Sequence, residues 1–344
     1  MKPRRLWLIG TAGACAALFL FASGAWGAFA LAYRAPGSRG LRFAVAAAWA
    51  TGCIALWVAW IAGHTSAGAS LVLAHVALLL WWATMRARND HLWADDVACL
   101  LTGDIDGDRV ELRNVRDFAW RAETDYDIRW DTRTFDLRRL ERVDAILSYW
   151  SSEAIAHAML SFGFDDARHV VFSVEIRRKR GEAFSEIGGF FRQFELILIA
   201  ADERDIVRVR TNVRGEDDYL FPLRMSRDAM RSLFVSYVEA ANELARKPRF
   251  YNTVTSNCTT IVYRMARRID GALPFDLRLL LTGYLPEYFR STGTLDRRLS
   301  VDEWRRLGRI TQRARATRPE DDFSAAIRDG VPAAQSPPSG DSTT

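Results

Sequence analysis

The stretch YNTVTSNCTTIVYRMARRI, residues 251–269, places a cysteine at the start of a predicted amphipathic helix. Apolar residues recur at helical spacing after this cysteine, and Ser256 or Asn257 can cap the first turn. A thiol at a helix N-terminus lies beside unpaired amides and the positive end of the helix dipole, which favour the thiolate. Cys258 is therefore either a prepared nucleophile or a small buried hydrophobic residue.

A predicted hairpin about a hundred residues earlier supplies possible partners for this thiol. The sequence AIAHAMLSFGFDDARHVVFSVEIRRK, residues 154–179, alternates apolar and polar residues on both sides of a turn at Asp165 to Arg168. Burying both apolar sets together requires odd-numbered residues to pair with odd-numbered residues. His157 and Glu175 then lie on one face as direct or diagonal neighbours.

A cysteine, a histidine and an orienting third group form the general arrangement for thiol catalysis of acyl transfer. The histidine takes the thiol proton, the third group fixes the histidine tautomer, and amides at the helix start stabilise an oxyanion. Glu175 and His169 compete for the third position. His169 can orient the base only if the turn is centred nearer Gly163. The alternative interpretations are a histidine satisfied by backbone groups, an ion pair between Glu175 and Arg178, and an exposed His169.

The first 88 residues are predicted to form a membrane anchor with two to three transmembrane helices. After the basic start MKPRR, long uncharged runs follow. His75 lies within the third of them and is expected to be neutral and hydrogen-bonded to a neighbouring helix. The runs span residues 6–33, 43–63 and 70–85, and the last ends in Trp81 and Trp82, as suits a membrane interface.

Residues 89–315 are expected to form one folded domain, and residues 316–344 a mostly disordered tail rich in Pro, Ser, Asp and Thr. A helix is predicted at 226–246. The stretch VRVRTNVRGEDDYLFPLRM, residues 207–225, is expected to contain a strand, a turn at Arg214 to Asp217 and another strand. The interspersed charges of RDIVRVRTNVRGEDD, residues 204–218, are expected on a solvated face.

Composition narrows the range of functions. The excess of 47 basic over 42 acidic residues is modest and dispersed, so we expect no nucleic-acid partner. The four cysteines show no CxxC spacing and no pattern typical of zinc or of a disulfide framework. We therefore expect no metal and no cofactor.

An ordered set of sequence blocks resembles a known family. Together they resemble the N-terminal catalytic domain of Lnb-type bacterial lipoprotein N-acyltransferases over about residues 92–312. The blocks are NVRDFAWRAETDYDIRW, TFDLRRL, VDAILSYW, AIAHAMLSFGF, FSVEIRRKRGEAFS, GFFRQFELILIAADERD, RTNVRGEDDYLF and YNTVTSNCTT. That family is similar to circularly permuted papain-like enzymes, in which the histidine strand precedes the cysteine helix. The resemblance implies an α+β fold, with the cysteine helix packed on an antiparallel sheet.

By this resemblance His157 matches the base and Cys258 the nucleophile. Asn257 and Thr259 flank the cysteine as in the family pattern, and with Thr260 they are the expected oxyanion or substrate-binding residues. The resemblance leaves Glu175 and His169 as alternatives for the third group.

The implied function is a membrane-anchored thiol acyltransferase that moves a fatty acyl chain from a phospholipid, through a Cys258 thioester, to an amine. The expected acceptor is the N-terminal cysteine of a lipoprotein. The family implies a periplasmic domain on the inner membrane, although the arginine distribution around the apolar runs favours an internal one. The alternatives are a cysteine peptidase or amidase acting on peptidoglycan peptides, and a binding protein with an inert Cys258.

Overall fold

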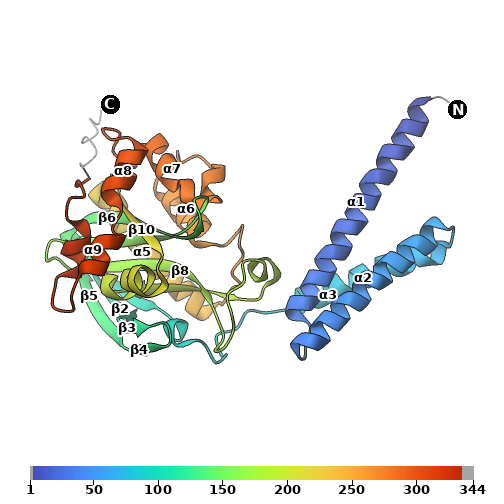
Figure 1. Ribbon diagram of the computed structural model, residues 1–344, viewed down its shortest axis with the longest axis horizontal. Helices are drawn as coiled ribbons and strands as arrows, with labels where there is room; N and C mark the ends of the chain where they lie inside the picture. Colours follow the sequence, from blue (N-terminus) through green and yellow to red (C-terminus); the bar gives the residue numbers. More distant parts are fainter. Residues whose placement is uncertain (1–2, 335–344) are drawn as a thin grey trace. The chain divides into compact units, whose positions relative to one another are not determined.

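The computed structural model describes residues 3–334, with side chains from Leu18 onward. The chain divides into two compact units (Figure 1). The helical unit comprises Met1–Ala87 and Ser185–Gln193, and the sheet unit comprises Arg88–Phe184 and Phe194–Thr344. A segment of the β-rich part of the sequence therefore belongs with the N-terminal helices.

The helical unit contains α1 (Pro3–Arg34), α2 (Arg39–Ile61) and α3 (Thr65–Thr84). Among the described residues, α2 and α3 are long and apolar enough to cross a membrane, and α1 has a shorter apolar segment at Leu18–Arg34. Two N-terminal apolar helices are thus present as predicted.

Small residues let the helices approach closely. The Trp49 indole donates a hydrogen bond to the Gly24 carbonyl at 3.0 Å, and a Cβ at Gly27 would overlap the Trp49 ring. His75 was expected to bond a neighbouring helix. Instead its Nδ1 lies 2.9 Å from the Leu71 carbonyl of its own helix.

Within the described residues, the sheet unit is built on an eight-stranded sheet with the order β1-β2-β9-β8-β7-β6-β10, and β5 also pairs with β2. All its paired strands run antiparallel except β2 and β9, which meet at Arg116 and Ala201. This arrangement confirms the predicted α+β class with a mostly antiparallel sheet. The strands of the sheet are β1 (Thr102–Asp106), β2 (Arg109–Arg116), β5 (Trp130–Asp136), β6 (Leu140–Ser152), β7 (Ile155–Phe164), β8 (His169–Arg177), β9 (Glu195–Ala201) and β10 (Asp217–Pro222), and β3 (Ala119–Ala122) pairs with β4 (Asp125–Asp127) in a small separate hairpin.

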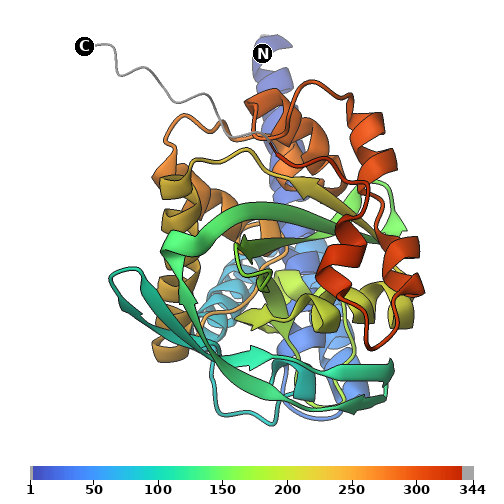
Figure 2. The same ribbon diagram turned by 90° about the vertical axis from the view of Figure 1, so that its left-hand side faces the viewer.

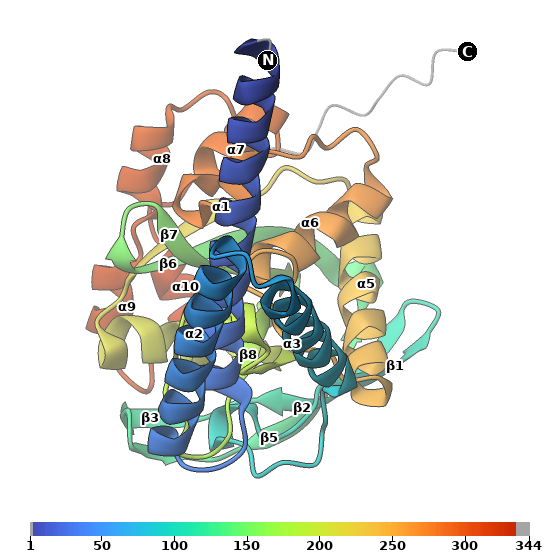
Figure 3. The same cartoon turned by 90° about the vertical axis from the view of Figure 1, so that its right-hand side faces the viewer.

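Helices cover both faces of this sheet (Figures 2 and 3). The helices are α4 (Glu203–Arg208), α5 (Arg227–Arg246), α6 (Cys258–Ile269), α7 (Leu285–Thr292), α8 (Val301–Gly308), α9 (Thr311–Ala316) and α10 (Phe323–Arg328). Short 3-10 turns are η1 (Asp95–Val97), η2 (Leu137–Arg139), η3 (Gly188–Phe191), η5 (Leu277–Leu279) and η6 (Thr282–Tyr284), and η4 (Val209–Arg214) is a π-helix. The predicted helix at 226–246 is confirmed as α5, with Ser226 as its cap.

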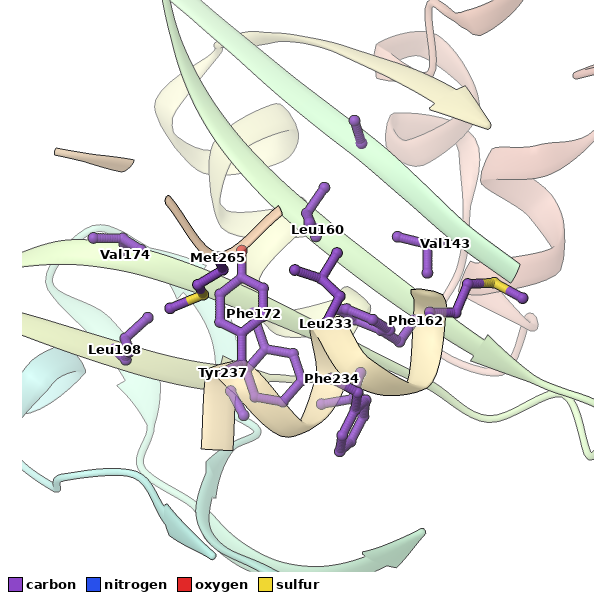
Figure 4. Close-up of a cluster of buried hydrophobic side chains, with 14 of the residues drawn as sticks. Val143, Leu160, Phe162, Phe172, Val174, Leu198, Leu233, Phe234, Tyr237 and Met265 are labelled. Atoms are coloured by element: carbon purple, nitrogen blue, oxygen red, sulfur yellow. The ribbon is translucent and has the colours of Figure 1, made fainter. Parts of the chain in front are cut away.

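The larger core lies between the sheet and helices α5 and α6 (Figure 4). Phe172 of β8 stacks on Tyr237 of α5 with ring centroids 4.8 Å apart, and the edge of Phe162 meets Phe234 at 5.2 Å. The opposite face is buried as well, because α4, α9 and α10 cover Met159 and Val171. Polar residues that share this second face therefore lie in a water-poor environment.

The C-terminal region departs from the expected tail. Helix α10 buries Phe323 and Ile327, which are 2 % and 0 % exposed. Asp322 caps this helix through the Ala325 amide, and one apolar pair at helical spacing anchors it. The prediction of a mostly disordered stretch from residue 316 is therefore wrong for this helix, and residues 335–344 lie outside the described residues.

Candidate active site

The register of β7 and β8 fixes which side chains can meet. The pairing runs from Gly163 opposite His169 to Met159 opposite Ser173, so odd-numbered residues pair with odd-numbered ones as predicted. The turn at Asp165 to Arg168 is also confirmed. Past Met159 and Ser173 the ladder ends, and two more residues along each strand lead to the predicted neighbours on the polar face.

His157 and Glu175 meet directly at this point. The Nε2 atom of His157 lies 3.0 Å from Oε1 of Glu175 and 2.7 Å from Oγ of Ser173. Ser173 donates its own hydroxyl proton to the same Glu175 oxygen at 2.8 Å. These contacts engage one ring nitrogen of His157 and fix the orientation of the imidazole.

The nucleophile candidate opens α6, as the sequence predicts. Cys258 is the first residue of the helix and is 8 % exposed. Burial alone would raise the pKa of its thiol, but a hydrogen bond with His157 and the positive charge of the imidazolium lower that pKa below its usual value. The Ala158 amide also stabilises the thiolate, and Ala158 lies immediately past the last paired position of β7 and β8.

The histidine is held in its charged form. Burial would lower the pKa of His157, and the Glu175 carboxylate together with the Cys258 thiol overrides this and raises the pKa to about 9. Burial opposes ionisation of Glu175 in turn, but His157 and Arg210 hold the pKa of that carboxyl well below its ordinary value. The site therefore favours a thiolate beside an imidazolium and a carboxylate.

Sequence reasoning missed the cation behind Glu175. Arg210, which is 6 % exposed, places Nη2 3.1 Å from Oε1 of Glu175 and Nη1 3.0 Å from Oε2 of Glu216. The prediction of a strand with solvated charges here is wrong, because the segment forms α4 and the π-helix η4 and turns this guanidinium inward. A π-helix inside a helical segment often marks a functional site. No pattern in the sequence predicted this π-helix.

A polar row continues across the sheet from this point. Ser148 of β6 is paired with His157 on one side and with Asp218 of β10 on the other. The Ser148 hydroxyl lies 2.5 Å from Oε2 of Glu216 and also contacts the Asp218 carboxylate. Burial raises the pKa of Asp218 to about 7. The row extends the hydrogen-bonded network away from the thiol.

The predicted oxyanion residues have a capping role in the structure. The Asn257 side chain accepts hydrogen bonds from the amides of Thr259 at 3.0 Å and Thr260 at 2.8 Å. The Thr260 hydroxyl accepts one from the Asn257 amide at 3.0 Å. The backbone amides of Thr259 and Thr260 are therefore already hydrogen-bonded. The Cys258 amide, for which the described residues provide no such acceptor, is the better oxyanion donor.

His169 does not join the site. It lies at the opposite end of β8 from Glu175, about 20 Å away along an extended strand. Its Nδ1 is 3.0 Å from the Ala167 carbonyl, and its ring fills the space above Gly163. The structure thus brings together Cys258, His157 and Glu175 and leaves His169 outside. Within the described residues, no group of three or more His, Cys, Asp or Glu side chains is arranged to hold a metal ion.

One comparison with known proteins finds a match that spans the candidate site. Residues 126–283 match the family described as the Lnb N-terminal periplasmic domain, which confirms the suspected resemblance for this segment. The matched segment contains the thiol, the imidazole and the carboxylate of the site. No curated protein and no solved structure matches the chain, so the circularly permuted papain-like topology stays a prediction. The matched segment covers a little under half of the 344 residues, and the two helices long and apolar enough to cross a membrane lie outside it.

Proposed function

We propose that this protein is a membrane-anchored thiol acyltransferase of the bacterial inner membrane, with its active site on the periplasmic side. Cys258 is the nucleophile, and His157 is the general base and acid. Glu175 orients the His157 ring and favours its protonated form. The acyl donor is a phospholipid, and the acceptor is the amine of a lipoprotein N-terminal cysteine.

One observation carries the proposal. A buried thiol with a lowered pKa opens a helix beside an imidazole that Glu175 holds at 3.0 Å. Structural cysteines in apolar surroundings have raised pKa values, so a lowered value in a buried position indicates a nucleophile. An inert Cys258 would need no charged partner behind His157.

The first half-reaction forms a thioester. The Cys258 thiolate attacks the carbonyl carbon of the acyl ester, and the developing oxyanion is stabilised by the Cys258 amide at the helix N-terminus. The ester C–O bond then breaks, and the His157 imidazolium gives its proton to the departing lysophospholipid oxygen. His157 uses Nδ1 for this transfer, because Glu175 and Ser173 engage Nε2.

The second half-reaction releases the acyl group. The acceptor amine attacks the thioester carbon, His157 takes the proton from the amine nitrogen, and the C–S bond breaks to return the thiolate. The resting thiolate and imidazolium are restored, and an amide is formed. These steps need no cofactor, because both the donor ester and the thioester are activated acyl groups.

The membrane helices support a lipid donor. An enzyme that takes acyl chains from phospholipid gains from being held in the bilayer, since the local donor concentration is then high. The family match adds support, because the matched domain is named as periplasmic.

Mass spectrometry of lipoprotein N-termini tests the proposal. Cells that carry the wild-type chain as their sole N-acyltransferase should contain N-acylated lipoproteins, and cells with Cys258→Ala should accumulate the free amine. Cys99→Ala is the matched control, because Cys99 is a second free cysteine in the sheet unit and should leave acylation intact.

Unchanged N-acylation in the Cys258→Ala strain would refute the transferase. Cleavage of peptidoglycan stem peptides by purified wild-type chain, without acyl transfer, would instead favour the amidase. Both assays compare the wild-type chain with Cys258→Ala and Cys99→Ala, so the two reactions are separated directly.

A further inference from the structure

The connection between β8 and β9 is the part of the sheet region that joins the helical unit. Its sequence, RKRGEAFSEIGGFFRQF at residues 178–194, combines basic residues with aromatic ones. Residues Ser185–Gln193 cluster with the membrane helices, and they contain the single 3-10 turn η3.

One aromatic residue of this connection is packed against the first helix. Phe191 stacks on Phe29 and on Tyr33, with ring centroids 5.5 Å and 5.7 Å apart. The Tyr33 hydroxyl also lies 3.2 Å from the Ser185 hydroxyl. The segment is therefore fastened to the last turns of α1.

A second attachment is made at the end of α3. The Arg192 guanidinium donates a hydrogen bond to the Trp82 carbonyl at 2.7 Å and lies 4.7 Å from the centre of the Trp82 ring. Carbonyls in the last turn of a helix have no partner within the helix, and a cation there is favourable. Arg192 therefore completes the C-terminal end of a predicted membrane span.

Two other large apolar side chains in the part of the segment that belongs to the helical unit are exposed. Ile187 is 49 % exposed and Phe190 is 45 % exposed. Two large apolar side chains within four residues can form an apolar patch suited to more than water. The helices of the same unit also expose apolar side chains, such as Leu79 and Leu80.

The position along the helices identifies the layer in which the segment lies. Trp81 and Trp82 lie in the last turn of α3, Tyr33 lies in the last turn of α1, and Trp26 meets Trp82 edge to face with ring centroids 5.2 Å apart. Tryptophan and tyrosine gather at the boundary between acyl chains and headgroups. The segment is attached at this aromatic belt. The lipid that surrounds the helices is therefore the partner that its exposed apolar side chains would contact.

We infer that residues 185–190 are an interfacial element that inserts Ile187 and Phe190 among the lipids at the membrane boundary. The segment adds a lipid contact that the transmembrane helices do not supply. The inference goes beyond the proposed chemistry. It does not depend on whether Cys258 is a nucleophile.

Site-specific photo-crosslinking tests this assignment. A diazirine amino acid is placed at position 187 or 190 of the full chain in vesicles of phosphatidylethanolamine and phosphatidylglycerol. Position 128 is the matched control, because Ile128 is an isoleucine with a similar exposure of 55 % in the sheet unit. After irradiation, mass spectrometry of the labelled peptides measures the lipid adducts.

We expect at least a tenfold higher yield of lipid adducts at 187 and 190 than at 128. Equal yields at the three positions would overturn the inference. Adducts at 187 and 190 to a second copy of the chain, without lipid adducts, would overturn it as well. Because each label replaces an exposed side chain, two independent positions guard against a local folding defect at one of them.

Discussion

Two buried ionic clusters lie on the same face of the sheet and differ in what they can do. The active-site cluster contains His157, Glu175, Arg210 and Glu216, and the thiol of Cys258 adjoins it. The closing cluster contains Asp144, Ser161, Glu203 and Arg328. In the closing cluster Arg328 contacts both oxygens of Glu203, at 2.7 Å and 2.5 Å, and Asp144 at 2.9 Å.

The difference lies in the groups that can exchange a proton near neutral pH. Arg328 outweighs burial and lowers the pKa of Glu203 to about 2, so Glu203 keeps its charge at every physiological pH. The active-site cluster includes an imidazole with a pKa of about 9 beside a thiol with a lowered pKa. One cluster fastens α10 to the sheet, and the other is arranged for proton transfer. The five predictions that follow test this contrast.

The largest effect is expected from His157→Ala. Removing the base should lower acyl transfer by about 10²–10⁴-fold. The same variant should slow alkylation of Cys258 by iodoacetamide, because the imidazolium no longer stabilises the thiolate. Peptide mass spectrometry separates this cysteine from Cys53 and Cys99. An unchanged alkylation rate would show that the two side chains are not coupled.

Arg328→Ala should act on stability and not on chemistry. Removing this cation leaves the buried Glu203 with the Ser161 hydroxyl but no cationic partner, and Asp144 with Arg142 alone. We expect a cost of about 3–5 kcal/mol in the free energy of unfolding. Arg318→Ala is the control, because Arg318 is exposed and its pairing with Asp321 is worth at most about 1 kcal/mol. Urea unfolding of the full chain in detergent measures both. Equal losses would remove the structural role of the closing cluster.

The pH range in which the closing cluster stabilises the fold follows from the direction of the Glu203 pKa shift. The pKa of Glu203 is lowered from 4.5 to about 2 on folding, so its stabilisation is fully present above pH 4.5. That stabilisation is lost as the pH falls towards 2. In Arg328→Ala the acid-dependent part of the unfolding free energy should therefore shrink.

The pH profile of acyl transfer should shift in opposite directions for the two neighbours of His157. The falling limb of kcat/KM is expected near pH 9, where the imidazolium deprotonates. Glu175→Gln removes the negative charge that raises the pKa of His157, so this limb should move towards acid by about one unit or more. Arg210→Gln removes a positive charge that lowers the pKa of His157, so the limb should move towards alkali.

Arg210→Lys is the matched control for the second shift, because it keeps the positive charge and should stay near the wild-type profile. Shifts of the same sign in Glu175→Gln and Arg210→Gln would contradict the electrostatic assignment.

The smallest effect is expected from His169→Ala. The ring of His169 packs over Gly163 at the far end of β8, so its loss should change acyl transfer by less than about twofold. Steady-state kinetics beside His157→Ala make the comparison. A loss of acyl-transfer activity as large as that of His157→Ala would show that His169 takes part in catalysis.

Much of the hairpin could be predicted from the sequence. Strand alternation has a period of two, so the apolar set of each arm fixed the register and put His157 and Glu175 on one face. The choice of Glu175 over His169 followed only from the observed turn at Asp165 to Arg168, because a shorter hairpin brings a different residue into place.

The rest of the site depends on segments that are distant in the chain. Arg210 and Glu216 resemble any surface-charge pattern in sequence, and only the packing of α4 and η4 against the sheet buries them. Helix α10 is similar, since Phe323 and Ile327 are too few to predict a packed helix in a polar stretch.

The sequence alone determined the helix that begins at Cys258, the paired strands of the hairpin and the apolar character of the N-terminal helices, because these depend on periodicity within a few neighbouring residues. The tertiary structure decided which charges are buried and which cation stands behind Glu175. Burial depends on what other parts of the chain cover a side chain, and no local pattern carries that information.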